Sequence, residues 1–209
     1  MSLNDWIRRT RIPEPAPVAR EVAVFEPADL YDVDTRDDPE AAPILCCTGD
    51  GAGAAAFNAL WLKRIAASGR YAAAVSVRGQ GGTPAAPGGI EARAHDVVQA
   101  VTGIPRQAVL VGHGLGAGWA ALAAARYPAA ALVMVAPGKL PKQLPKPVGG
   151  PPVLLVVSED DAQSKGVQAI AETFGVAPLT FAGDANDVFK GTNAEGLLDA
   201  ILSWLDRKD

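Results

Sequence analysis

The sequence predicts an α/β fold, in which helices flank both faces of an open, doubly wound and mostly parallel sheet. Short runs of mostly apolar residues recur along the chain, bounded by Gly, Pro or charged residues. Continuous apolar strands indicate a parallel sheet that is buried on both faces. Segments rich in helix formers separate these runs, and this alternation is typical of right-handed strand–helix–strand units. Ligands bind such sheets at the carboxyl ends of the strands.

Length and composition favour one domain. The chain has 209 residues, of which 49% are hydrophobic and 20% are charged, enough for one sizeable core. We expect an extended arm at residues 1–20, rich in Pro and Arg, followed by a single domain at residues 21–209. The net charge of -4 supplies no basic excess for binding phosphates, so we expect no nucleic-acid partner.

The sequence contains no recognisable targeting or membrane segment. The basic residues near the start are not followed by an apolar segment, as a signal peptide would require. No run of about 18 apolar residues occurs, so no membrane span is predicted. These observations favour a cytoplasmic location. Cys46 and Cys47 are adjacent in a predicted buried strand, where they would point to opposite faces, and we expect no disulfide between them.

The elements follow in order along the chain. Residues 21–26 alternate between polar and apolar and predict an antiparallel strand at a sheet edge. Further strands are predicted at residues 44–48, 71–78, 108–113, 131–136, 153–158 and 178–182. Helices are predicted at residues 54–68, 90–101, 115–127, 162–174 and 193–207. The long connection at residues 137–152 is too short for a lid domain.

A glycine-rich turn joins the predicted strand at residues 108–113 to the next helix. The pattern G-x-G-x-G spans Gly112, Gly114 and Gly116, and small residues allow a helix to pack closely against a strand. This turn resembles the nucleophile elbow of the α/β-hydrolase family, in which the middle residue is the nucleophile, most often serine. Gly114 holds the middle position here and has no side chain that could attack a substrate.

The resemblance also implies positions for the acid and the base of a catalytic triad, which follow the nucleophile in that order. Asp161 is the first candidate for the acid and Asp160 the second, because both follow the strand at residues 153–158. In an alternative interpretation, these carboxylates begin the next helix, where their negative charge interacts favourably with the N-terminal end of the helix dipole. Asn186 holds the place where relatives commonly carry the histidine base. An asparagine side chain cannot act as a general base near neutral pH.

A third likeness concerns the oxyanion hole. The segment Thr48-Gly49-Asp50 resembles a loop of this family that usually begins with the residues His-Gly. The resemblance implies that the backbone N–H groups of Asp50 and Leu115 could bind an oxyanion or a ligand, with Gly49 and His113 close by. Relatives frequently carry histidine at the position of His113. The loop from Arg78 to Pro84 also resembles a family loop, for which we expect a structural role.

Cofactor and metal sites are not indicated. Residues 112–117 formally fit the dinucleotide fingerprint G-x-G-x-x-A, but the following strand lacks the acidic residue that such sites need. No spacing typical of metal ligands occurs. We therefore expect neither a cofactor nor a metal.

The leading functional hypothesis is an α/β-hydrolase-like protein with a degraded triad and without serine-hydrolase chemistry. It would bind a small-molecule ligand or a protein partner. Assembly with a second copy of the same chain is also compatible with the sequence. The alternative is an esterase-like hydrolase that acts through another constellation, for example a water held by Asp161 and Asn186. Engineered inactivation of a serine hydrolase at Gly114 and Asn186 is a further alternative.

Overall fold

The computed structural model describes residues 22–25, 41–104, 106–138, 140, 144, 150–184, 187–189 and 191–208. The predicted arm at residues 1–20 and most of the long connection at residues 137–152 lie outside this part of the chain, as does Asn186. No helix in the described ranges is both long enough and apolar enough to cross a membrane.

A seven-stranded sheet forms the centre of the molecule, in the order β1-β3-β2-β4-β5-β6-β7. Strands β2 to β7 run parallel, whereas β1 pairs antiparallel with β3 at one edge, so both predictions about strand direction are confirmed. The order follows the typical pattern of a doubly wound sheet, in which the chain moves outward in both directions. The strands are β1 (Val22–Phe25), β2 (Ile44–Thr48), β3 (Ala72–Val75), β4 (Val109–His113), β5 (Ala131–Val135), β6 (Val153–Ser158) and β7 (Leu179–Phe181).

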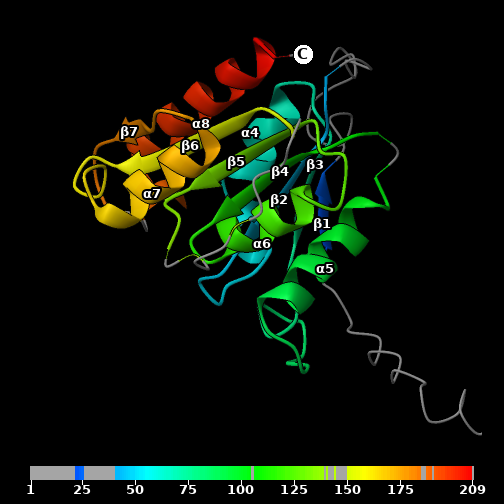
Figure 1. Ribbon diagram of the computed structural model, residues 1–209. Coiled ribbons are helices and arrows are strands. Elements are labelled where there is room, and N and C mark those ends of the chain that lie inside the picture. Colours follow the sequence, from blue (N-terminus) through cyan, green and yellow to red (C-terminus); the bar gives the residue numbers. More distant parts are fainter. Residues whose placement is uncertain are drawn as a thin grey trace, which may run out of the picture.

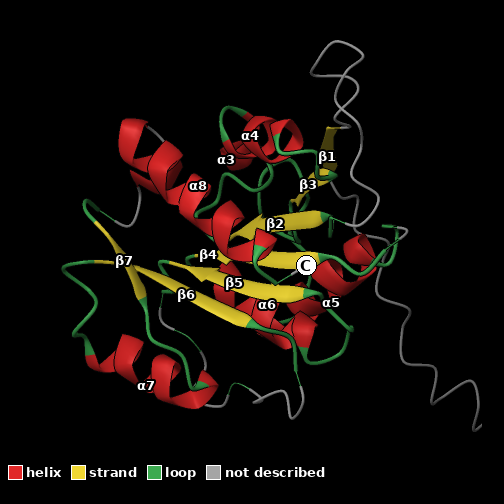
Figure 2. Cartoon of the chain, turned by 90° about the horizontal axis from the view of Figure 1, so that it is seen from above, coloured by secondary structure: helices red, strands yellow, loops and turns green. Residues whose placement is uncertain are grey.

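Helices cover both faces of the sheet (Figures 1 and 2). Figure 2 shows α3, α4 and α8 on one face and α5, α6 and α7 on the other. This arrangement confirms the predicted fold class. The helices are α3 (Ala55–Asn58), α4 (Trp61–Ala67), α5 (Ile90–Val101), α6 (Gly116–Ala124), α7 (Lys165–Phe174) and α8 (Gly191–Asp206).

Each face of the sheet has its own apolar core. Cys46 belongs to the cluster that contains Phe57 of α3 and Trp61 of α4, whereas Cys47 belongs to the cluster beneath α5, α6 and α7. All residues of β2 to β5 are buried, which explains why the sequences of these strands are mostly apolar without alternation. Both thiols are free, as expected for neighbours on opposite faces.

Two predicted helices differ from the observed ones. The segment at residues 54–68 forms two short helices, α3 and α4, although it contains no Gly or Pro to mark the break. Helix α7 begins at Lys165, later than predicted, because the Ser164 side chain accepts a hydrogen bond from the Val167 N–H and caps the helix. The acidic residues 159–161 therefore precede α7, and the interpretation that they begin this helix is wrong.

Candidate functional site

The glycine turn, defined as Gly112 to Gly116, places three glycines in different surroundings. A Cβ atom added to Gly112 would lie 2.4 Å from the Gly116 carbonyl oxygen, and one added to Gly116 would lie 2.6 Å from the Cys47 carbonyl oxygen. Gly114 has φ +58°, in the left-handed region, and a Cβ atom there would meet no atom within 4 Å. Close packing thus requires the outer glycines, while the middle position faces open space.

Hydrogen bonds from the neighbouring strands fix this turn. The Gly114 N–H donates to the Val135 carbonyl at the end of β5 (3.1 Å), and the Gly138 N–H donates to the Gly114 carbonyl (3.1 Å). On the β2 side, the Gly49 N–H donates to the His113 carbonyl (3.3 Å). The structure therefore brings together Gly49, His113, Gly114 and Leu115, as the sequence predicts.

The two predicted oxyanion donors are the backbone N–H groups of Leu115, which follows Gly114, and of Asp50, which follows Gly49. Within the described part of the chain, the Leu115 N–H has no hydrogen-bond acceptor, and the Asp50 N–H reaches only the Thr48 hydroxyl at 3.4 Å. The Asp50 carboxylate accepts a hydrogen bond from the Ala52 N–H (2.9 Å) within its own exposed loop. A backbone N–H without an acceptor, as at Leu115, can bind a carbonyl or carboxylate oxygen.

His113 lies within the packed core, 4% exposed. Its Nδ1 atom is 2.9 Å from the Thr48 hydroxyl oxygen, and its ring packs edge-on against Phe189 with a centroid distance of 4.6 Å. Thr48 and His113 are register partners on β2 and β4. This burial favours a structural role for the imidazole, and its predicted part in ligand binding remains a prediction.

Asp161 lies at the carboxyl end of β6, where its side chain is exposed. Its N–H donates to the Ser158 carbonyl (3.1 Å), and the Ser158 hydroxyl donates to the Gly183 carbonyl (2.8 Å). Among the described residues, no hydrogen bond joins the Asp161 carboxylate to the glycine turn. Asn186, which holds the base place between them in the family resemblance, lies outside the described residues.

A cavity of about 500 Å³ lies beside Asp161, within the size range of small-molecule sites. The segment from Ala136 to Gly138 forms the wall nearest the glycine turn, because Gly138 also bonds to Gly114. Ala136 has φ +41°, the one positive value among the described residues other than glycine. The remaining lining comes from Leu140, Leu144, Val157, Asp161, Ser164, Gly166, Val167, Ala169, Ile170 and Thr173.

An aromatic cluster that was not predicted holds the segment next to Asn186. The Trp61 indole N–H donates to the Val188 carbonyl (2.7 Å), and the rings of Phe57 and Trp61 both pack against Phe189. The partners are far apart in the sequence, so periodicity within one segment gives no signal for this contact. It anchors residues 187–189 to α3 and α4.

The loop that begins at Arg78 contains a buried ion pair. The Arg78 guanidinium donates two hydrogen bonds to the Asp96 carboxylate (2.8 and 2.6 Å) and one to the Pro87 carbonyl. The hydrogen bonds to Asp96 raise the pKa of Arg78, so this group stays charged. These contacts support the expected structural role of the loop.

The cysteines do not offer a replacement nucleophile. Burial raises the pKa of Cys47 to about 12 and that of Cys46 well above its ordinary value. A thiol attacks as the thiolate, which such a pKa makes scarce at neutral pH. The described residues also include no group of His, Cys, Asp or Glu side chains that could hold a metal ion.

Comparison with known proteins identifies the family. A family model described as "Alpha/beta hydrolase family" matches residues 44–207. The chain belongs to the α/β-hydrolase family. This α/β-hydrolase is also similar in structure to known esterases and lipases, and these likenesses show the fold alone because the sequence identities are low. No curated protein matched the sequence.

Three solved structures illustrate the likeness. An esterase from Thermogutta terrifontis shares 15% identity with this α/β-hydrolase, with a TM-score of 0.70, over 93% of this chain and 96% of the other. A monoacylglycerol lipase from Paleococcus ferrophilus shares 16% identity, with a TM-score of 0.69, over 91% and 100%. A structure from a study of carboxylesterases of Nitrososphaera gargenis shares 12% identity, with a TM-score of 0.70, over 92% and 97%.

Proposed function

We propose that this α/β-hydrolase has lost serine-hydrolase chemistry and binds a small ligand at the carboxyl ends of its parallel strands. The observation that carries the proposal is Gly114, which holds the nucleophile place in a turn otherwise suited to a nucleophile. Serine hydrolysis needs a hydroxyl at that place and a base that removes its proton. Glycine supplies no hydroxyl, and Asn186 in the base place supplies no basic nitrogen.

The other described side chains near the turn do not substitute for the missing groups. His113 is buried and contacts the Thr48 hydroxyl, and its ring packs against Phe189. Cys47 lies beneath the turn with its pKa raised to about 12. The second histidine, His95, lies on the exposed side of α5. These positions argue against a relocated nucleophile or base in the described part of the chain.

Features that serve binding remain in place. Leu115 follows Gly114, whose Cβ position meets no atom within 4 Å, and the wall of the cavity of about 500 Å³ includes Gly138, which bonds to Gly114. Backbone donors and an adjacent apolar cavity are the usual components of a small-molecule site. Binding therefore requires no group that the sequence lacks.

A second candidate function is hydrolysis by a water molecule that Asp161 activates. The observation in its favour is Asp161, which lines the cavity and whose carboxylate accepts no hydrogen bond from the described residues. A carboxylate in such a position can accept a proton from water. No described hydrogen bond links the Asp161 carboxylate to the glycine turn, which makes this candidate the weaker one.

Steady-state hydrolysis of p-nitrophenyl acetate distinguishes the two candidates. We expect the unmodified chain to release p-nitrophenol no faster than an equal concentration of its Asp161→Ala variant. A common slow release that ceases once surface groups are acylated would reflect only that acylation and not turnover. Turnover by the unmodified chain that Asp161→Ala abolishes would overturn the proposal in favour of water activation, and turnover that survives this change would indicate another nucleophile.

A further inference from the structure

We infer that the cavity beside α7 takes an apolar small molecule that carries a cationic amine, and that the amine pairs with the Asp161 carboxylate. This inference rests on the proposed binding function and specifies its ligand. The lining residues place the cavity between the segment that follows β5 and the helix α7. Figures 1 and 2 show where β5 and α7 lie in the fold. Its volume of about 500 Å³ is large enough for a small organic molecule.

The wall of the cavity is mostly aliphatic. The aliphatic lining comes from Leu140 and Leu144 after β5, from Val157 of β6, and from Val167 and Ile170 of α7. Burial of an aliphatic ligand against this wall gives binding energy in proportion to the apolar area removed from water. The body of the ligand should therefore be apolar.

The polar side chains on the wall identify the head group. The Ser164 hydroxyl accepts the Val167 N–H at 3.3 Å as the cap of α7, and the Thr173 hydroxyl donates to the Ala169 carbonyl at 2.7 Å. Both hydroxyls thus have partners within α7. Asp161 is the one charged side chain among the described lining residues, and no described residue donates to its carboxylate. A carboxylate accepts hydrogen bonds and does not donate them, so the complementary group on a ligand is a donor, most favourably a cation.

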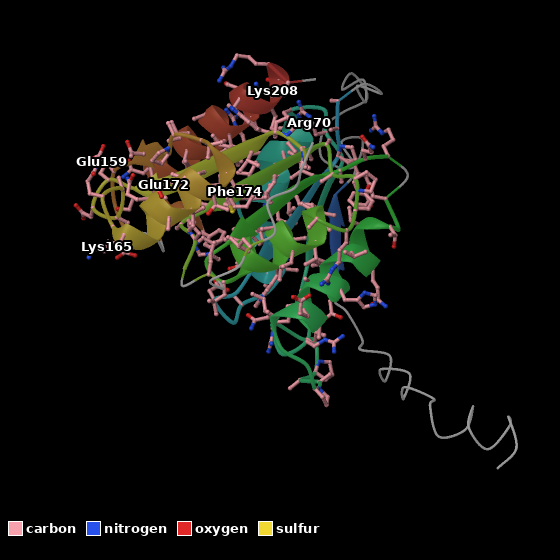
Figure 3. The ribbon with its side chains drawn as sticks, viewed as in Figure 1. Arg70, Glu159, Lys165, Glu172, Phe174 and Lys208 are labelled. Atoms are coloured by element: carbon pink, nitrogen blue, oxygen red, sulfur yellow. The ribbon has the colours of Figure 1, made fainter. Side chains whose placement is uncertain are left out.

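Neighbouring charges strengthen the preference for a cation. Glu159 and Asp160 directly precede Asp161 and are exposed, so three consecutive carboxylates surround this end of β6. Figure 3 shows Glu159 and Lys165 at the outer tip of this end of the molecule. Lys165 is exposed as well, and neither it nor Glu159 and Asp160 is part of the cavity lining. The three carboxylates outnumber this lysine, so the described charges at this end of the molecule favour a positive ligand group.

Backbone strain at the cavity wall is consistent with a binding role. Ala136 has φ +41° although its side chain disfavours this region, and its N–H donates to the Val156 carbonyl at 2.7 Å. A strained residue persists where the surrounding structure imposes its conformation, and such residues concentrate at functional sites. Here the strained residue directs the chain from β5 into the wall that separates the cavity from Gly114.

Titration with octylamine, octanol and octanoate tests the inference, because the three probes share one chain and differ in head-group charge. Backbone amide NMR spectra of the full chain give both the affinity and the site. We expect octylamine to bind about tenfold more tightly than octanol, and octanoate to bind most weakly, because a charge-assisted hydrogen bond adds to the shared apolar contacts. The shifted resonances should include Gly138, Gly166 and Ile170.

Two variants locate the head group. Asp161→Asn should reduce the affinity for octylamine to that for octanol and leave the octanol affinity unchanged. The matched control Glu159→Gln removes a neighbouring exposed carboxylate outside the cavity lining and should keep most of the preference for the amine. Equal binding of all three probes by the unmodified chain, or shifts confined to residues away from the cavity, would overturn the inference. The hydrolysis assay tests the proposed function separately, so each can fail without the other.

Discussion

At the scale of single residues, the three glycines of the turn serve two different physical purposes. Gly112 and Gly116 allow β4, α6 and β2 to approach, since a methyl group at either site would overlap a backbone atom. Gly114 instead allows a left-handed backbone conformation at a site that has room for a side chain. The sequence pattern predicts the turn, but only the coordinates distinguish a glycine required for packing from a glycine in open space.

This distinction predicts different costs for substitution. Gly114→Ser should lower the free energy of unfolding by about 1 kcal/mol, because only the backbone conformation becomes strained. Gly112→Ala should lower it by about 3 kcal/mol, because the new Cβ atom overpacks the start of α6. Urea denaturation measures both changes. Gly166→Ala, on α7 with no atom near its Cβ position, is the control and should not destabilise the protein. Equal losses for Gly112→Ala and Gly114→Ser would contradict this account of the turn.

At the scale of elements, the positions of the strands follow from local sequence, while several helix boundaries do not. Strands β2 and β6 match their predicted ranges, because each is an apolar run between clear turn signals. The break between α3 and α4 has no local signal, since no Gly or Pro lies there. The start of α7 depends on which of several polar residues becomes the cap, and the structure selects Ser164. Boundaries that depend on such competition need tertiary information.

The contact between α4 and residues 187–189 is a tertiary feature with a measurable contribution. Trp61→Phe keeps an aromatic ring but removes the N–H that bonds to the buried Val188 carbonyl, so we expect a loss of about 1 to 3 kcal/mol in the free energy of unfolding. Hydrogen exchange near Phe189 should also accelerate, because this bond anchors the segment. Trp204→Phe on α8, where the ring is half-buried, is the control and should cost less. A Trp61→Phe variant as stable as the control would show that the hydrogen bond contributes little.

At the scale of the whole molecule, the parallel sheet brings distant segments to one edge. The carboxyl ends of β2, β4, β5 and β6 carry, in turn, the Gly49 loop, the glycine turn, the Ala136 segment and Asp161. Sequence alone predicts this convergence, because strand ends in a doubly wound sheet meet at the same edge. The cavity could not be predicted in the same way. It depends on the described lining residues between β5 and β6, such as Leu140 and Leu144, and on α7, and no local pattern determines the distance between the two.

The proposed loss of serine-hydrolase chemistry requires that the family scaffold persist without it, and the sheet explains how it can. The apolar clusters on its two faces, the buried Arg78–Asp96 pair and the aromatic cluster around Trp61 do not involve the position of the missing nucleophile. The interactions that stabilise the fold are therefore separate from the groups that a serine hydrolase needs. Such separation allows one fold to carry different functions.

The most direct test of the central claim is covalent labelling with a fluorophosphonate, which phosphonylates an activated serine and releases fluoride. Intact-mass spectrometry counts the adducts. We predict that the unmodified chain gains none, whereas the double variant Gly114→Ser, Asn186→His gains one adduct at residue 114, because the turn and its backbone donors remain in place. An adduct on the unmodified chain would contradict the claim that this α/β-hydrolase has lost its nucleophile.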